Sequence, residues 1–125
     1  MSEKPHRKLI VWQKAMSFVE TIYRLTESFP KTEQFGLTTQ LRRAAVSIVS
    51  NIAEGAARQT SREYLQALYI ARGSVSEVDT QLEIAQRLDL ITAGQQHSAM
   101  EDLDDISRLL NGLMSSKRGA ACLTH

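Results

Sequence analysis

Polar side chains gather on one strip of a predicted helix in the stretch LRRAAVSIVSNIAEGAARQTSREY, residues 41–64. At about 100° per residue, one side of this helix carries Ser47, Asn51 and Glu54, bordered by Gln40, Arg43 and Ser50. Polar groups beside an apolar face are typical of a helix–helix or subunit interface, where they fix register at some cost in stability. We therefore expect Asn51 and Glu54 to bond to Arg58, to Arg72 or to a neighbouring chain.

The alternative interpretation of the same strip is a half-exposed helix face. Its serines would bond back to their own helix, and Glu54 would pair with Arg58 four residues on, a contact worth only about 0.2–0.5 kcal/mol.

The residue types that carry most enzyme chemistry are not arranged for it. No histidine lies near Ser47 or Ser50 in the sequence to act as a base, and the three histidines lack zinc-like spacing: they are His6, His97 and His125. The glycines form neither a phosphate-binding loop nor a dinucleotide fingerprint, and the paired Glu-x-x-His motifs of di-iron bundles do not occur. We predict no catalytic, cofactor or metal site. One enzymatic alternative stays open, a pocket that gathers Arg43, Glu54 and Glu77.

Charge is distributed unevenly in a chain whose net charge is +1. Residues 1–62 carry ten Lys or Arg against five Asp or Glu, a net of +5, and residues 63–125 carry five against nine, a net of −4. The two halves could attract each other between subunits, or the basic flank could bind a polyanion. The candidate nucleic-acid contacts are Arg42, Arg43, Arg58 and Arg62, together with the basic N-terminal arm.

Apolar residues recur at helical spacing along most of the chain. A first helix over residues 11–29 has one stripe formed by Val11, Ala15, Phe18, Ile22, Leu25 and Phe29. Its second stripe is Trp12, Met16, Val19 and Tyr23, so its apolar face is wider than one seam between helices requires. Pro30 ends this helix. A second helix opens near Leu37 or Thr38, and Gly55 ends or weakens it.

Two capping boxes mark the later helix starts. Thr60 and Glu63 predict a helix from Ser61 to about Leu88 or Asp89, and Thr92 with Gln95 predicts a fourth helix. Small residues in helices two and three should let their backbones approach closely within the core: Ala44, Ala45, Ala53, Ala67, Ala71, Gly73 and Ser74.

The sequence thus predicts an all-α protein, an antiparallel up-down-up-down four-helix bundle, because the connections are short. We expect an N-terminal arm (1–8), one bundle domain (9–115) and a C-terminal tail (116–125) that holds a free thiol at Cys122. No apolar run is long enough to span a membrane, and no signal-like segment is present, so we expect a cytoplasmic protein.

Three segments resemble a known family: LIVWQKA, FPKTEQFGLTTQLRRAAVSIVSNIAEGAAR and ARGSVSEVDTQLEIAQRL. They are similar to bacterial four-helix-bundle proteins often encoded by intervening sequences within 23S rRNA genes. The resemblance covers about residues 9–88 and implies a small cytoplasmic bundle that forms a ring-like homopentamer. It also implies a distant kinship with accessory proteins of diversity-generating retroelements, which are strongly basic and bind nucleic acid and a reverse transcriptase.

Two functions follow as expectations. The first is a non-enzymatic homo-oligomeric module without cofactor or small-molecule substrate, whose partner is a copy of itself. The alternative is an RNA- or DNA-binding accessory protein that uses a basic face of the oligomer.

Overall fold

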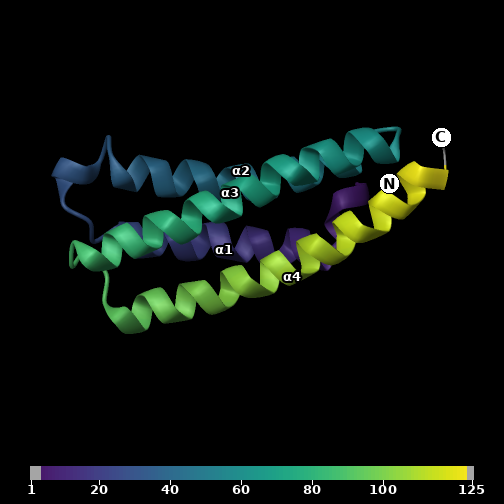
Figure 1. Cartoon of the computed structure of the whole chain (residues 1–125). Helices are drawn as coiled ribbons and strands as arrows, with labels where there is room; N and C mark the ends of the chain where they lie inside the picture. Colours follow the sequence, from purple (N-terminus) through teal and green to yellow (C-terminus); the bar gives the residue numbers. More distant parts are fainter. Residues whose placement is uncertain (1–3, 124–125) are drawn as a thin grey trace.

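Four long helices lie side by side in the computed structural model, which describes residues 4–123 (Figure 1). Their bounds are α1 (Ile10–Thr26), α2 (Leu37–Ala56), α3 (Ser61–Arg87) and α4 (Ala93–Leu123), with 3-10 turns η1 (Pro5–Lys8) and η2 (Lys31–Glu33). The described residues contain no strand, so the predicted all-α four-helix bundle is confirmed. Within this range, no helix combines the length and the apolar character that crossing a membrane requires.

Successive helices reverse direction along the bundle. In Figure 1, α1 leads away from the end where the chain starts, α2 returns to it, α3 leaves again and α4 comes back. Each helix contacts its neighbour in the chain, α1 also contacts α4, and the contact between α2 and α3 is the most extensive. The four helices therefore enclose a single core.

Apolar side chains from all four helices fill that core. The largest of those that are fully buried are Phe18, Ile22, Leu41, Ile48, Ile52, Leu68, Val78, Leu82, Leu103, Ile106, Leu110 and Met114. Burying one such side chain stabilises the fold by about 1.5–3 kcal/mol relative to leaving it exposed. Because they recur every three or four residues, each helix turns one face inward.

The capping box of Thr92 and Gln95 is confirmed in full, and that of Thr60 and Glu63 is confirmed for the threonine hydroxyl. The Thr60 hydroxyl accepts a hydrogen bond from the Glu63 backbone amide at 3.1 Å, and α3 begins at the next residue. The Thr92 hydroxyl accepts from the Gln95 backbone amide at 3.0 Å, while the Gln95 side chain accepts from the Thr92 amide at 2.8 Å. These bonds satisfy amides that the first turn of a helix leaves unpaired.

Two helix ends differ from the prediction. The first helix ends at Thr26 rather than Phe29, and the chain turns before Pro30, which disfavours the helical conformation at Phe29. Phe29 is nevertheless buried in the core.

The fourth helix continues through residues 116–123, so the expected tail is wrong for this range, and Cys122 is exposed on a helix. Residues 124–125 and 1–3 lie outside the described range.

The two predicted stripes of α1 have different environments. The first is largely buried, with Val11, Ala15, Phe18 and Ile22 in the core. In the second, Trp12 and Val19 are half-buried against the core, whereas Met16 and Tyr23 are 43% and 40% exposed. Part of the wide apolar face therefore stays uncovered in the single chain.

Candidate functional site

The polar strip of α2 contributes to a small network that faces α3. The Ser74 hydroxyl of α3 donates to the Ser47 hydroxyl at 2.8 Å, and the Asn51 amide donates to the same oxygen at 3.1 Å and to the Ser47 carbonyl at 2.8 Å. Ser74 is only 4% exposed. The strip thus connects two helices of one chain. The prediction did not name Ser74 as the partner, because a contact across 27 residues leaves no local pattern.

The other members of the strip face solvent. Glu54 forms an ion pair with Arg58 and Ser50 is exposed, which matches the alternative of a half-exposed face for this part of α2. Arg72 does not reach Asn51 or Glu54; its guanidinium lies 5.1 Å from the centre of the Tyr69 ring on α3.

The four candidate arginines for nucleic-acid binding are not brought together. Arg42 is committed to the fold: its Nε donates to the Thr26 hydroxyl at 2.9 Å, and its guanidinium lies 4.4 Å from the centre of the Tyr23 ring. Arg58 and Arg62 lie beyond the other end of α2, which ends at Ala56, roughly 20 Å along the axis from Arg42 at ~1.5 Å per residue. The candidate set therefore splits into two groups.

Arg43 lies on a ridge of α2 between two shallow grooves. One groove, of about 430 Å³, faces α1, and its lining includes Tyr23 and Val46. The other, of about 330 Å³, faces α3, and its lining includes Glu77 and Gln81. Gln81 is 8% exposed, and its Oε1 atom is buried without any hydrogen-bond partner in the structure.

An unpartnered buried amide oxygen costs about 1–3 kcal/mol of desolvation. The α2–α3 groove thus holds the unpartnered Gln81 oxygen together with the positive charge of Arg43 and the negative charge of Glu77. No ion pair within residues 4–123 includes either charged side chain. Glu54 does not line this groove. The three groups of the enzymatic alternative are therefore not gathered in one pocket.

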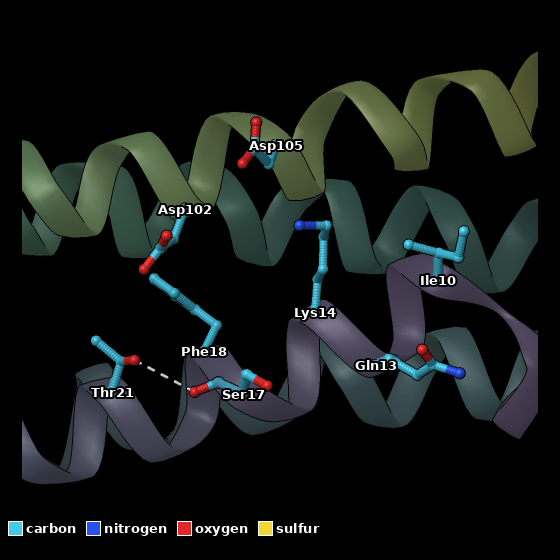
Figure 2. A pocket seen from close by; sticks show the side chains of 8 residues that line it. All are labelled: Ile10, Gln13, Lys14, Ser17, Phe18, Thr21, Asp102 and Asp105. Carbon is cyan, nitrogen blue, oxygen red and sulfur yellow. Dashed lines mark hydrogen bonds between the residues drawn. The ribbon is translucent and has the colours of Figure 1, made fainter.

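A third groove, of about 400 Å³, lies between α1 and α4 and was not singled out from the sequence. Figure 2 shows the Lys14 side chain extending from α1 toward α4, where Asp102 and Asp105 line the opposite wall. The Thr21 hydroxyl donates to the Ser17 carbonyl at 3.3 Å (Figure 2). Within the described range, no three His, Cys, Asp or Glu side chains converge to hold a metal ion.

Three titrating groups outside the strip have altered pKa values: Tyr64, Glu83 and Arg87, whose pKa is raised first by its hydrogen bond to Glu83. Burial raises the pKa of the Tyr64 hydroxyl on α3. The pKa of Glu83 is lowered, first by the hydrogen bond from Arg87 and then by that from Gln96. Arg87 Nε lies 2.8 Å from one carboxylate oxygen, and Gln96 Nε2 lies 2.8 Å from the other. The second bond ties α3 to the first turns of α4.

Comparisons with known proteins agree with this architecture. A solved structure from Bacteroides thetaiotaomicron, described as a protein with unknown function from the S23 ribosomal protein family, is 27% identical and superposes with a TM-score of 0.76. The match covers 84% of this chain and 98% of that one. No curated protein matches the sequence. The model of the family described as "23S rRNA-intervening sequence protein" matches residues 7–112. Since this range is most of the chain, the protein belongs to the 23S rRNA-intervening sequence protein family.

Proposed function

We propose that the protein is a non-enzymatic subunit that assembles with copies of itself into a closed ring. The observation that carries this proposal is the presence of two apolar stripes, on different helices, that remain exposed after the four helices have packed. A monomeric protein has no use for two such surfaces, whereas a subunit interface covers them.

The first surface, here called the α1–α2 stripe, consists of Met16, Tyr23 and Val46. Their exposed fractions are 43%, 40% and 38%, and the α1–α2 groove runs between Tyr23 and Val46. Arg42 already holds the Tyr23 ring in place. A fixed aromatic ring beside an apolar groove favours association, because little side-chain freedom is lost on binding.

The second surface, here called the α3 stripe, consists of Ile70, Gly73, Ile84 and Leu88. At about 100° per residue all four fall on one side of α3, and the α2–α3 groove with the unpartnered Gln81 oxygen lies beside them. A polar group of a neighbouring copy in this groove would supply the missing hydrogen bond.

Gly73 supports the same assignment. The prediction that it serves close packing within the chain is wrong, because a Cβ atom placed there would meet nothing within 4 Å. A glycine inside a helix costs about 1 kcal/mol relative to alanine. The close approach of a second copy would account for this glycine.

Two unlike surfaces on one chain favour a contact in which the α1–α2 stripe of one copy meets the α3 stripe of the next. Such a head-to-tail contact closes into a ring when the rotation between copies divides a full turn. The homopentamer implied by the family resemblance is one closed form of this kind.

The test is light scattering coupled to size-exclusion chromatography. We expect the wild-type protein to elute as one species of several copies, five for the pentamer. Val46→Glu and Ile84→Glu should each break the ring into smaller species, since each places a charge in one half of the contact. Phe35→Glu is the matched control, because Phe35 is 90% exposed and belongs to neither stripe.

Mixing the two broken variants distinguishes a head-to-tail contact from a symmetric one. Val46→Glu retains an intact α3 stripe and Ile84→Glu retains an intact α1–α2 stripe, so together they should form a one-to-one dimer that cannot close. A monomeric wild-type protein at micromolar concentration would refute the assembly. Dimers of Ile84→Glu alone would refute the head-to-tail arrangement.

A further inference from the structure

Basic residues from three separate segments meet at one end of the bundle. Figure 1 shows that the N-terminal segment, the turn between α2 and α3, and the last turns of α4 all lie at this end. Residues 4–8, 54–64 and 115–123 contain seven Lys or Arg against two Glu, a net of +5 in a chain whose total is +1. The seven cations, here called the basic pole, are Lys4, Arg7, Lys8, Arg58, Arg62, Lys117 and Arg118.

Charge is therefore separated along the bundle axis as well as between the two halves of the chain. Lys117 and Arg118 come from the acidic half, and they join this end because α4 continues through the segment expected to be a tail. The two glutamates of these three segments already have partners. Glu54 forms an ion pair with Arg58, and the Glu63 carboxylate accepts a hydrogen bond from the Thr60 hydroxyl at 2.9 Å. The cations of these segments thus outnumber their acidic side chains by five.

The two cations that α4 contributes, Lys117 and Arg118, lie against aromatic rings of α3. Lys117 Nζ lies 4.5 Å from the centre of the Tyr64 ring. The Arg118 guanidinium lies 5.9 Å from the Tyr69 ring, and its Nε donates to the Tyr69 hydroxyl at 3.4 Å. Neither cation forms an ion pair within the described residues. Rings fix these cations without cancelling their charge, so an anion binds them at a smaller entropic cost.

The N-terminal turn repeats this arrangement. The Arg7 guanidinium of η1 lies 5.5 Å from the centre of the Trp12 ring, and the centres of the His6 and Trp12 rings lie 4.9 Å apart. The Arg7 carbonyl accepts a hydrogen bond from the Gln13 side chain at 2.8 Å, which ties η1 to α1. Two ordered groups of cations thus flank the same end of the bundle.

We propose that the basic pole binds the phosphodiester backbone of a nucleic acid. Several cations on separate segments match a chain of evenly spaced phosphates, and guanidinium groups bind phosphate oxygens through two donors at once. A lipid bilayer fits less well, because the aromatic rings here are covered by cations and are not free to insert.

The experiment measures fluorescence anisotropy of a labelled single-stranded RNA and of a duplex of the same sequence. We expect wild-type protein to bind at micromolar concentration in about 50 mM salt, with an affinity that falls steeply as salt rises. The double variant Lys117→Ala/Arg118→Ala should weaken binding at least tenfold. The slope of log affinity against log salt concentration should also become shallower, by the equivalent of about two phosphate contacts. The single-stranded and duplex arms identify which form of the backbone the pole prefers.

The matched control is Arg24→Ala/Lys31→Ala, which removes the same charge from exposed residues at the opposite end. It should bind like the wild-type protein. Equal losses in both double variants, or no complex at about 50 mM salt, would overturn the proposal. So would binding to phosphatidylserine vesicles without binding to RNA. Light scattering should give the Lys117/Arg118 variant the wild-type subunit number, so this test is independent of the test of assembly.

Discussion

The hydroxyl groups of Ser47 and Ser74 lie 2.8 Å apart, and their hydrogen bond links α2 to α3 where the two helices pack most extensively. Asn51 donates to the Ser47 oxygen as well, so this oxygen accepts from both helices. The bond favours the observed register between α2 and α3, because it pairs the buried Ser74 hydroxyl with a hydroxyl of the facing helix.

Removing this bond should destabilise the protein measurably. Ser74→Ala deletes the donor, and Ser47→Ala leaves the Ser74 hydroxyl unpaired; each should lower the free energy of unfolding by about 0.5–1.5 kcal/mol. Urea denaturation followed by circular dichroism measures the change. Ser50→Ala, on the exposed side of the same helix, should stay within about 0.5 kcal/mol of wild type. Equal stabilities for Ser74→Ala and the wild-type protein would contradict the assigned bond.

Glycines at two helical positions should respond to alanine in opposite directions. A Cβ at Gly55 would lie 3.0 Å from a ring carbon of Tyr64 and 3.2 Å from the Ala67 Cβ, whereas at Gly112 it would meet nothing within 4 Å. Gly55→Ala should therefore cost about 1–2 kcal/mol, as forced overpacking does. Gly112→Ala should gain up to about 1 kcal/mol from helix propensity. Thermal unfolding of both variants checks the signs, and a stabilised Gly55→Ala protein would disprove the close packing of α3.

Arg42 should act through its planar shape and not only through its charge. Its Nε bonds to Thr26 while its guanidinium lies over Tyr23, and a lysine cannot make both contacts at once. Arg42→Lys and Arg42→Ala should both lower the free energy of unfolding, by about 1 kcal/mol for the lost hydrogen bond. Arg43→Lys is the control, because no side-chain hydrogen bond of Arg43 occurs in the described structure. Full stability of Arg42→Lys would show that charge alone suffices.

Glu83 should titrate below its ordinary pKa of 4.5, because Arg87 and Gln96 both bond to its charged form. A lowered pKa in the folded state means that this contribution to stability is present above the ordinary value and is lost as pH falls through the folded value. Carbon-detected NMR titration measures the shift, and Arg87→Ala should raise the pKa toward 4.5. Arg24→Ala should leave it unchanged. An ordinary pKa in the wild-type protein would contradict the contact.

Much of the fold follows from local sequence signals. The capping boxes at Thr60 and Thr92 locate the starts of α3 and α4, because their bonds span only three residues. The spacing of apolar residues identifies the buried face of each helix for the same reason. The end of α4 could not be predicted in this way. Contacts of Lys117 and Arg118 with rings of α3, about fifty residues earlier, accompany its last turns.

The candidate site was harder to predict, because its polar residues choose among partners in three dimensions. Asn51 bonds to Ser47 on its own helix, although Arg58 and Arg72 also carry suitable groups. Arg42 resembles the other basic residues in sequence, and only its position beside Thr26 shows that it belongs to the fold. The unpartnered oxygen of Gln81 had no signal at all in the sequence.

The groove between α1 and α4 marks the contact that joins the parts of the bundle farthest apart along the chain (Figure 2). Forming the contact between α1 and α4 requires that the residues between these two helices be ordered, whereas α2 and α3 meet across a short turn. We expect the α2–α3 hairpin to form early during folding and to exchange its amide hydrogens last. The seam along Lys14 and Asp102 is then where the native protein opens first.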